Sequence, residues 1–220
     1  MFAGIAPRYD LLNRLLSLGL DQRWRRKAVR LLGPRPGERI LDLCSGTGDL
    51  ALAVDEAAAG ARVVSADFTF EMLALGRRKA RGAGRQVRET GADGLRLPFA
   101  EGTFDGVTAG FGVRNFEDRA AGFRETARVL RPGGRFLVLE FTPEPTGALR
   151  PLVRLHTRLL LPVVGGLVSG DGRAYRYLPE SMHAWPAPAA LARELSRAGF
   201  GRVDVHPLSF GVAAIHVAVK

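Results

Sequence analysis

Short apolar runs alternate with longer amphipathic stretches through the middle of the chain. The short runs have the length and composition of buried strands, and the stretches between them repeat apolar residues at helical spacing. This alternation is typical of an α/β fold in which helices cover a mostly parallel sheet. The pattern predicts strands at residues 39–43, 61–66, 86–90, 104–109 and 135–141.

The helix predicted before the fifth of these strands has the clearest pattern. Its apolar side chains recur at spacings of three and four and should face the sheet, and the Arg-Pro-Gly-Gly segment at 131–134 should end it. The side chains in question are Phe116, Ala120, Phe123, Ala127 and Leu130.

Further elements are predicted at both ends of the chain. Helices at 9–20 and 21–32 should precede the first strand, with Asp21 as an N-cap and Gly33 as the stop. A helix at 189–198 and extended runs at 202–210 and 212–219 should close the chain. Because only a tight connection at Gly211 separates these two runs, we expect them to pair as an antiparallel hairpin.

These elements predict one Rossmann-like α/β domain over residues 1–220, with a seven-stranded, mostly parallel sheet, helices on both faces and a C-terminal antiparallel hairpin. Residues 1–34 should form the N-terminal helices, and 35–141 with 187–220 the core. Residues 142–186 interrupt the alternation with a segment containing Pro, Gly, Tyr and His, which suggests an insertion on the substrate side.

Composition narrows the class of protein. A single cysteine, Cys44, excludes an intrachain disulfide and favours a cytoplasmic setting, and 46% hydrophobic with 25% charged residues excludes disorder. The longest apolar run, 159–168, contains Pro162 and two glycines and is too short to span a membrane. The net charge of +10 would attract nucleic acid, acidic ligands or anionic lipid, although dispersed arginines also arise from heat adaptation. Neither metal-ligand spacing nor a P-loop occurs.

A glycine-rich turn follows the first predicted strand. Gly46 and Gly48 would let the backbone approach a ligand closely, and Asp67 at the end of the second strand could hold two ribose hydroxyls. Two cofactors fit this spacing. One is a nicotinamide dinucleotide, whose pyrophosphate would rest on the helix N-terminus, and the other is S-adenosylmethionine.

Charge favours S-adenosylmethionine. Asp42 and Asp49 would repel a pyrophosphate, whereas carboxylates attract the ammonium and sulfonium groups of S-adenosylmethionine. Asp93, followed by Gly94, comes after the third strand, where methyltransferases of this fold place an acidic residue near the adenine amino group. Asp42, Asp67 and Asp93 thus end three successive strands, and the fold predicted is that of a class I S-adenosylmethionine-dependent methyltransferase. The alternatives are a tight turn without a ligand, and Asp67 as the N-cap of a helix at 69–81.

The chain resembles the ubiquinone/menaquinone-biosynthesis C-methyltransferase family almost from end to end. The glycine turn and the Arg-Pro-Gly-Gly segment are shared by many methyltransferases, but Phe-Gly-x-Arg-Asn and Tyr-x-Tyr-Leu-x-Glu-Ser are much more specific. In one departure, Asp67-Phe68-Thr69 replaces the family's Asp-x-Ser, and the chain begins at the first motif. The matching segments are 5–13, 16–19, 24–25, 46–49, 111–115, 130–134, 139–141, 174–181, 198–200 and 211–216.

The resemblance implies both a cofactor site and an acceptor. The cofactor would contact Thr47, Asp67, Asp93 and Gly94, with Phe68 beside them, and Asp42, Gly46 and Gly48 would shape the pocket. The implied reaction is methylation of a ring carbon of a reduced polyprenyl quinone, in the direction demethylmenaquinol to menaquinol. Such an acceptor lies in a bilayer, so peripheral membrane contact is compatible with the basic charge. A homo-oligomer is left open.

Methylation of a ring carbon requires more than alignment of the partners. Ionising the neighbouring hydroxyl, whose pKa should be about 10 as in tyrosine, pushes electron density onto the carbon, and a cation beside the oxygen stabilises the phenolate. Arg114 and Asn115, after the fourth strand, are candidates for this role. Tyr175, Tyr177 and His156 are candidates to contact the acceptor, and the base is not identified.

Other functions are left open at this point. The acceptor could belong to the ubiquinone branch, or it could be another small molecule. RNA is disfavoured because Gly110-Phe111-Gly112 stands where RNA methyltransferases carry an Asn-Pro-Pro-Tyr type of segment. A non-catalytic protein that binds the cofactor is the remaining alternative.

Overall fold

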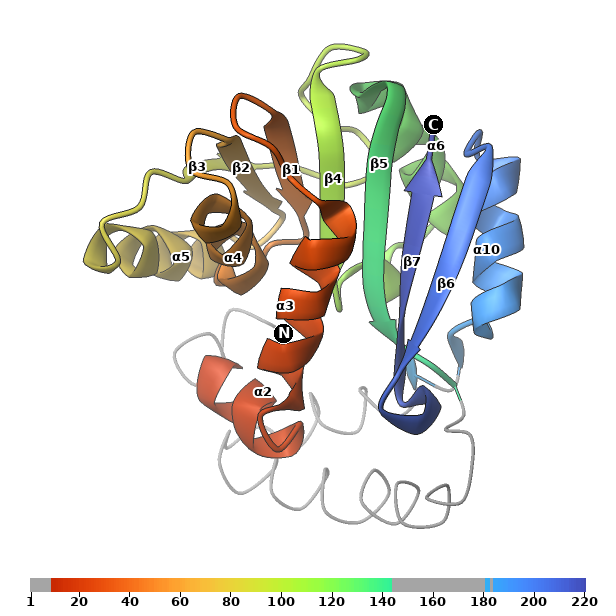
Figure 1. Cartoon of the computed structure of the whole chain (residues 1–220), viewed down its shortest axis with the longest axis horizontal. Helices are drawn as coiled ribbons and strands as arrows, with labels where there is room; N and C mark the ends of the chain where they lie inside the picture. The colour runs from red at the N-terminus through yellow and green to blue at the C-terminus, as the bar shows by residue number, and fades with distance from the viewer. Residues whose placement is uncertain (1–8, 144–180, 183) are drawn as a thin grey trace.

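A computed structural model describes residues 9–143, 181–182 and 184–220. The described chain forms one seven-stranded sheet in the order β3-β2-β1-β4-β5-β7-β6 (Figure 1). The strands are β1 (Arg39–Leu43), β2 (Arg62–Asp67), β3 (Arg88–Gly91), β4 (Phe104–Gly110), β5 (Leu130–Phe141), β6 (Arg202–Leu208) and β7 (Ala213–Val219).

The first five strands are parallel, and β7 runs antiparallel to both β5 and β6. This arrangement confirms the predicted parallel sheet with a C-terminal antiparallel hairpin. The helices are α2 (Tyr9–Leu16), α3 (Leu20–Leu32), α4 (Asp49–Ala57), α5 (Phe70–Gly82), α6 (Arg119–Val129) and α10 (Pro188–Arg197). Short 3₁₀ turns are η2 (Val113–Asn115) and η4 (Ser209–Gly211).

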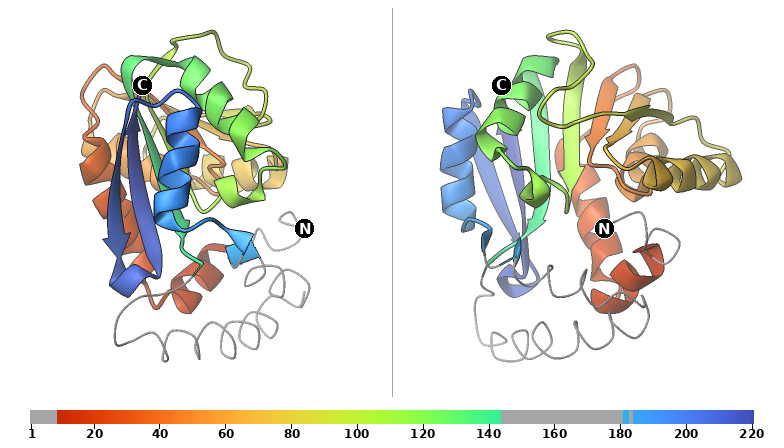
Figure 2. Two further views of the ribbon diagram at one scale, coloured as in Figure 1. Left: turned by 90° about the vertical axis from the view of Figure 1, so that its right-hand side faces the viewer. Right: turned by 180° about the vertical axis from the view of Figure 1, so that it is seen from behind.

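Helices cover both faces of the sheet. Figure 1 shows α3 and α4 in front of the sheet, and the right-hand view of Figure 2, taken from behind, shows α6 and α10 over the opposite face. Because side chains alternate along a strand, β5 serves both cores: Leu137 packs with the α3 and α4 side, and Phe136 with the α6 and α10 side. All four of these helices therefore bury an apolar face against strands that end at one common edge.

One helix cap and one core-facing helix position were predicted incorrectly. Asp21 is not the N-cap of α3; Gly19 takes that position with φ +74°, and Asp21 is buried in the first turn, where it accepts a hydrogen bond from Ser17 Oγ at 2.8 Å. Gly33 does end α3, in the left-handed conformation that glycine tolerates. In α6, Ala120 is exposed rather than turned to the sheet.

Strand β5 begins at Leu130, whereas the predicted start was residue 135. The Arg-Pro-Gly-Gly segment ends α6 as expected but enters the strand through a register shift opposite Phe104 and Gly106. The final hairpin also differs, because η4 rather than Gly211 alone connects β6 to β7.

The predicted insertion at 142–186 lies almost entirely outside the described residues. Among the helices that the structure describes, none has the length and apolar character needed to cross a bilayer.

Candidate functional site

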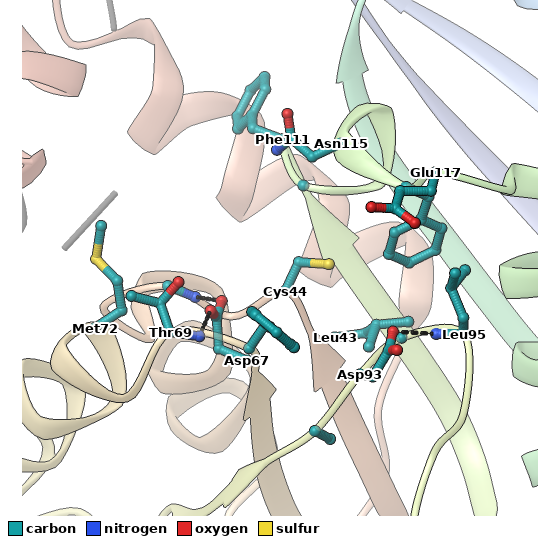
Figure 3. Close-up of a pocket in the computed structure, with 16 residues that line it drawn as sticks. Leu43, Cys44, Asp67, Thr69, Met72, Asp93, Leu95, Phe111, Asn115 and Glu117 are labelled. Carbon is teal, nitrogen blue, oxygen red and sulfur yellow. Dashed lines mark hydrogen bonds between the residues drawn. The ribbon is translucent and has the colours of Figure 1, made fainter. Parts of the chain in front are cut away.

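A cavity of about 360 Å³ opens at the carboxyl edge of the sheet (Figure 3). Its wall comes from the loops that follow β1, β2, β3 and β4, which is where open parallel sheets bind ligands. Five of the predicted cofactor residues line it, together with one of the two predicted catalytic residues: Gly46, Asp67, Phe68, Asp93, Gly94 and Asn115.

The glycine turn between β1 and α4 brings the backbone to this cavity. Gly46 and Gly48 have φ values of +55° and +79°, which side chains larger than hydrogen rarely permit. Gly48 forms the N-cap of α4, and its N–H bonds to the Ser45 carbonyl at 2.9 Å. The tight turn leaves the main chain of Gly46 exposed to a ligand.

Asp67 links the turn to the next unit of the fold. One carboxylate oxygen accepts the Gly46 N–H at 2.8 Å and the other accepts the Thr69 N–H at 2.8 Å (Figure 3). The N-cap of α5 is Thr69, so Asp67 precedes the helix rather than capping it. Each carboxylate oxygen can accept a second hydrogen bond, which leaves capacity for two hydroxyl groups in the cavity.

Asp93 lies across the cavity from Asp67 (Figure 3). Its Oδ1 accepts the Leu95 N–H at 2.9 Å, which orients the exposed carboxylate. Gly94 is buried next to it, and a Cβ at that position would stand 2.7 Å from the ring of Phe116. This side of the cavity thus combines an acidic acceptor with a closely packed aromatic wall.

Asp42 does not line the cavity but is buried beneath the glycine turn. Its carboxylate accepts the Ala51 N–H at 3.0 Å and the Thr108 hydroxyl at 2.8 Å. Burial raises the pKa of Asp42 to about 7, although the hydrogen bond from Thr108 and the charge of Arg25 oppose this shift. Asp42 therefore shapes the turn from below.

Thr47 also points away from the cavity, into a network that fastens α2 to the glycine turn. Its hydroxyl donates to Asp10 at 2.5 Å, and Lys79 contacts Asp10 at 2.5 Å and Asp49 at 2.6 Å. Burial alone would raise the pKa of Asp49, but the charges of Arg25 and Lys79 hold it below its usual value. Because the positive charges of Arg25 and Lys79 offset its own, Asp49 does not supply the free negative charge expected from the sequence.

The structure separates the two predicted catalytic residues. Asn115 lines the cavity, whereas the side chain of Arg114 is 7% exposed and forms an ion pair with Glu140 at 3.0 Å. The same guanidinium also donates to the Phe111 carbonyl. Burial raises the pKa of Glu140, and Arg114 counteracts that shift. Among the sequence signals, the acidic position in the apolar run of β5 could have revealed this pair.

Other cavity residues had no functional role in the sequence interpretation. Cys44 lies in the floor with φ +54°, and burial and the nearby carboxylates raise the pKa of its thiol. A Cβ at Gly112 would overlap the Cβ of Cys44, so this position admits only glycine without a shift of the backbone. Phe111 and Met72 complete the apolar part of the wall.

Tyr175, Tyr177 and His156, the predicted acceptor contacts, lie outside the described residues. Within the part of the chain that is described, no group of three or more His, Cys, Asp or Glu side chains could hold a metal ion.

The parallel sheet with its antiparallel hairpin, the glycine turn and the two cavity carboxylates define the class I methyltransferase fold. Solved structures share this fold. One is an S-adenosylmethionine-dependent methyltransferase from Aquifex aeolicus, with a TM-score of 0.65 at 17% identity, over 89% of this chain and 88% of that one. Phosphoethanolamine N-methyltransferase 2 from Haemonchus contortus, in complex with S-adenosyl-L-methionine, has a TM-score of 0.67 at 16% identity, over 89% of this chain and 52% of that one.

The ubiE/COQ5 methyltransferase family model matches residues 1–220, and the chain belongs to this family. It is therefore an S-adenosylmethionine-dependent methyltransferase, as the sequence predicted. Two curated relatives bear the name demethylmenaquinone methyltransferase. The one from Thermus thermophilus is 57% identical over 217 residues, 99% of this chain and 98% of the relative. The one from Deinococcus radiodurans is 46% identical over 220 residues, 100% of this chain and 91% of the relative.

Proposed function

We propose that the chain methylates a ring carbon of demethylmenaquinol to form menaquinol. The observation that carries the proposal is the 57% identity, over almost the whole of both chains, to a relative named demethylmenaquinone methyltransferase. That name also favours the menaquinone branch over the ubiquinone branch, which the residues alone left open. The cavity at the carboxyl edge of the sheet supports a reaction between two bound partners.

The residues around the cavity fit S-adenosylmethionine. Asp67 keeps acceptor capacity for the two ribose hydroxyls, and Asp93 can accept from an adenine amino group. Neither Asp67 nor Asp93 has a basic partner in the ion pairs recorded among the described residues, so their charge also suits a cationic ligand. Phe68, 79% exposed beside the cavity, can cover an aromatic base.

The cofactor supplies an electrophilic methyl group when bound, and the protein aligns the ring carbon with it and excludes water. Asn115 lies on the cavity wall and can hydrogen-bond the hydroxyl of the acceptor beside the reacting carbon. Arg114 acts as a positioning residue, because its bonds to Phe111 and Glu140 fix the turn that presents Asn115. The ring proton must leave to a base or to water after the new bond forms.

The test is transfer of label from methyl-labelled S-adenosylmethionine to demethylmenaquinol kept reduced with dithionite. Label should enter the reduced quinol but neither the oxidised quinone nor total RNA. Asp67→Asn should weaken cofactor binding, whereas Asn115→Ala should lower turnover with cofactor binding intact. Intact cofactor binding with no label in the quinol would refute the acceptor and leave the cofactor site standing.

A further inference from the structure

One aromatic ring of the cavity wall lies on the other side of the sheet from the one that strand alternation predicts. Val107 and Ala109 of β4 pack with the α6 and α10 side, so Phe111 would join them if the strand simply continued. Phe111 packs instead with the α3 and α4 side. Its φ of +59°, in the left-handed region that large side chains rarely adopt, turns the side chain to this face. The turn at the end of β4 therefore sets the direction of this ring.

Hydrogen bonds and close packing hold the backbone of Phe111 in this conformation. Its N–H donates to the Leu139 carbonyl of β5 at 2.8 Å, and its carbonyl accepts from the guanidinium of Arg114. The next residue, Gly112, lies so close to Cys44 that a Cβ at Gly112 would overlap the Cβ of Cys44. Left-handed backbone that its surroundings keep in place concentrates at functional positions.

The ring of Phe111 is fixed by two other aromatic side chains and a cation. Its centroid lies 4.7 Å from that of Phe141 and 6.1 Å from that of Trp24, at tilted angles in both cases. The guanidinium carbon of Arg25 lies over the ring, 5.6 Å from the centroid. These three side chains do not line the cavity, whereas Phe111, which is 9% exposed, does. A ligand in the cavity therefore meets a ring that has little freedom to move.

Phe111 belongs to the part of the cavity that lies away from the two carboxylates. Asn115 lies in the same turn, and its N–H donates to the Gly112 carbonyl at 3.0 Å. Figure 3 shows Phe111 and Asn115 toward one end of the cavity and Asp67 and Asp93 toward the other. The carboxylates suit the hydroxyl and amino groups of the cofactor, so the acceptor should occupy the end with the ring and the amide.

We propose that Phe111 determines the specificity of the acceptor site, because its ring contacts the ring of the acceptor and favours a fused two-ring quinol over a one-ring quinol. Aromatic pairs in offset-stacked or edge-to-face geometry gain free energy beyond the area that they bury. A second fused ring enlarges the surface available for this contact. Phe111 has this role only if the acceptor is a quinol, so the inference rests on the proposed function.

The test compares methyl transfer to two short-tailed quinols kept reduced with dithionite. One is demethylmenaquinol, which has two fused rings, and the other is a benzoquinol with the same tail and an unsubstituted ring carbon. The parent should prefer the two-ring quinol in kcat/KM about tenfold. Phe111→Leu keeps an apolar side chain but removes the ring, so it should lower this preference about fivefold, mainly through KM.

The ratio of the two kcat/KM values separates contact with the acceptor from damage to the fold. A purely structural defect lowers transfer to both quinols by the same factor, which leaves the ratio unchanged. The cofactor Kd of Phe111→Leu, measured by calorimetry, should stay within about twofold of the parent. Phe111→Gly removes the ring and also relieves the left-handed backbone, so it should lower the ratio in the same way and serves if Phe111→Leu does not fold.

Phe99→Leu is the matched control. Phe99 also contacts another ring, that of Phe104 at 4.9 Å, but does not line the cavity, so the control should keep the parental ratio. An unchanged ratio in the Phe111 variants, an equal fall in the control, or a parent without preference would overturn the role of Phe111 and leave the proposed function standing. Label in neither quinol with the parent would overturn the proposed function, and this inference with it.

Discussion

Replacing Arg114 with methionine should make the stability of the protein steeply dependent on pH through Glu140. The parent ion pair spans 3.0 Å with side chains 7% and 1% exposed, and Oε2 of Glu140 has no hydrogen-bond partner among the residues that the structure describes. Removing one member of a buried pair leaves an uncompensated charge, which typically costs about 3–5 kcal/mol. The variant can escape part of this cost by folding with Glu140 protonated.

The free energy needed to protonate Glu140 sets the size of this pH dependence. With an ordinary glutamate pKa of about 4.3 and about 1.4 kcal/mol per pH unit, protonating the carboxyl costs at most about 5 kcal/mol at pH 8 and about 1 kcal/mol at pH 5. The pKa of Glu140 is already raised in the parent, and losing Arg114 removes the largest influence that lowers it. The folded variant therefore binds a proton that the unfolded chain releases. Its stability thus falls as the pH rises above the ordinary glutamate pKa.

The assay is urea unfolding at pH 5 and pH 8 of the parent, Arg114→Met, Glu140→Gln and the double variant. The loss of unfolding free energy caused by Arg114→Met should be larger at pH 8 by up to about 4 kcal/mol. The double variant should lack this added pH dependence because the carboxyl is gone. An equal loss at both pH values would refute the reasoning, since Glu140 would then stay ionised without its partner.

Three further outcomes are expected. Asp42 has a folded pKa of about 7, above the ordinary value of about 3.9, so the free energy of unfolding should fall from about pH 4 to 7, and Asp42→Asn should flatten this slope in urea titrations. Gly112→Ala should weaken cofactor binding measured by calorimetry, and adding Cys44→Gly should restore part of it by clearing the overlap; no restoration would show that the strain lies elsewhere. Lys79→Met should raise the cofactor Kd about fivefold and less at high salt, because Asp10 loses its ion pair and keeps only the bond from Thr47, which loosens α2 from the glycine turn; an unchanged Kd would separate α2 from the site.

The strands were predictable because their signals are local. Strand β1 matches its predicted bounds, β2 is shifted by one residue at both ends, and β4 extends one residue further at its end. The early start of β5 at Leu130 escaped prediction because Pro and Gly normally stop a strand. The pairing of Leu130 with Phe104 and the backbone bonds of Gly133 and Gly134 with Lys220 draw this segment into the sheet. Asp21 escaped for a similar reason, since its burial against Ser17 and Arg25 outweighs its preference for a cap.

The sequence also predicted the position of the site but not the direction of its side chains. Strand ends and the glycine turn are properties of the backbone, so Gly46, Asp67 and Asp93 could be placed at one edge from spacing alone. Whether Thr47 faces the cavity depends on Asp10, which lies 37 residues away in sequence. Likewise, Arg114 faces inward because it forms an ion pair with Glu140, which lies in β5.

The three strand-end carboxylates look equivalent in the sequence, yet they act on a ligand by different routes. Asp42 is buried and reaches the cavity only through the helix start that it bonds at Ala51, whereas Asp67 and Asp93 have oxygens on the cavity wall. A neutral amide at position 42 can still accept from Ala51 and donate to Thr108, so it preserves the turn. The same change at Asp67 replaces an oxygen that accepts from a backbone N–H by a donor. It therefore breaks the turn and the ligand contact together, and cofactor affinity should fall much more for Asp67→Asn than for Asp42→Asn.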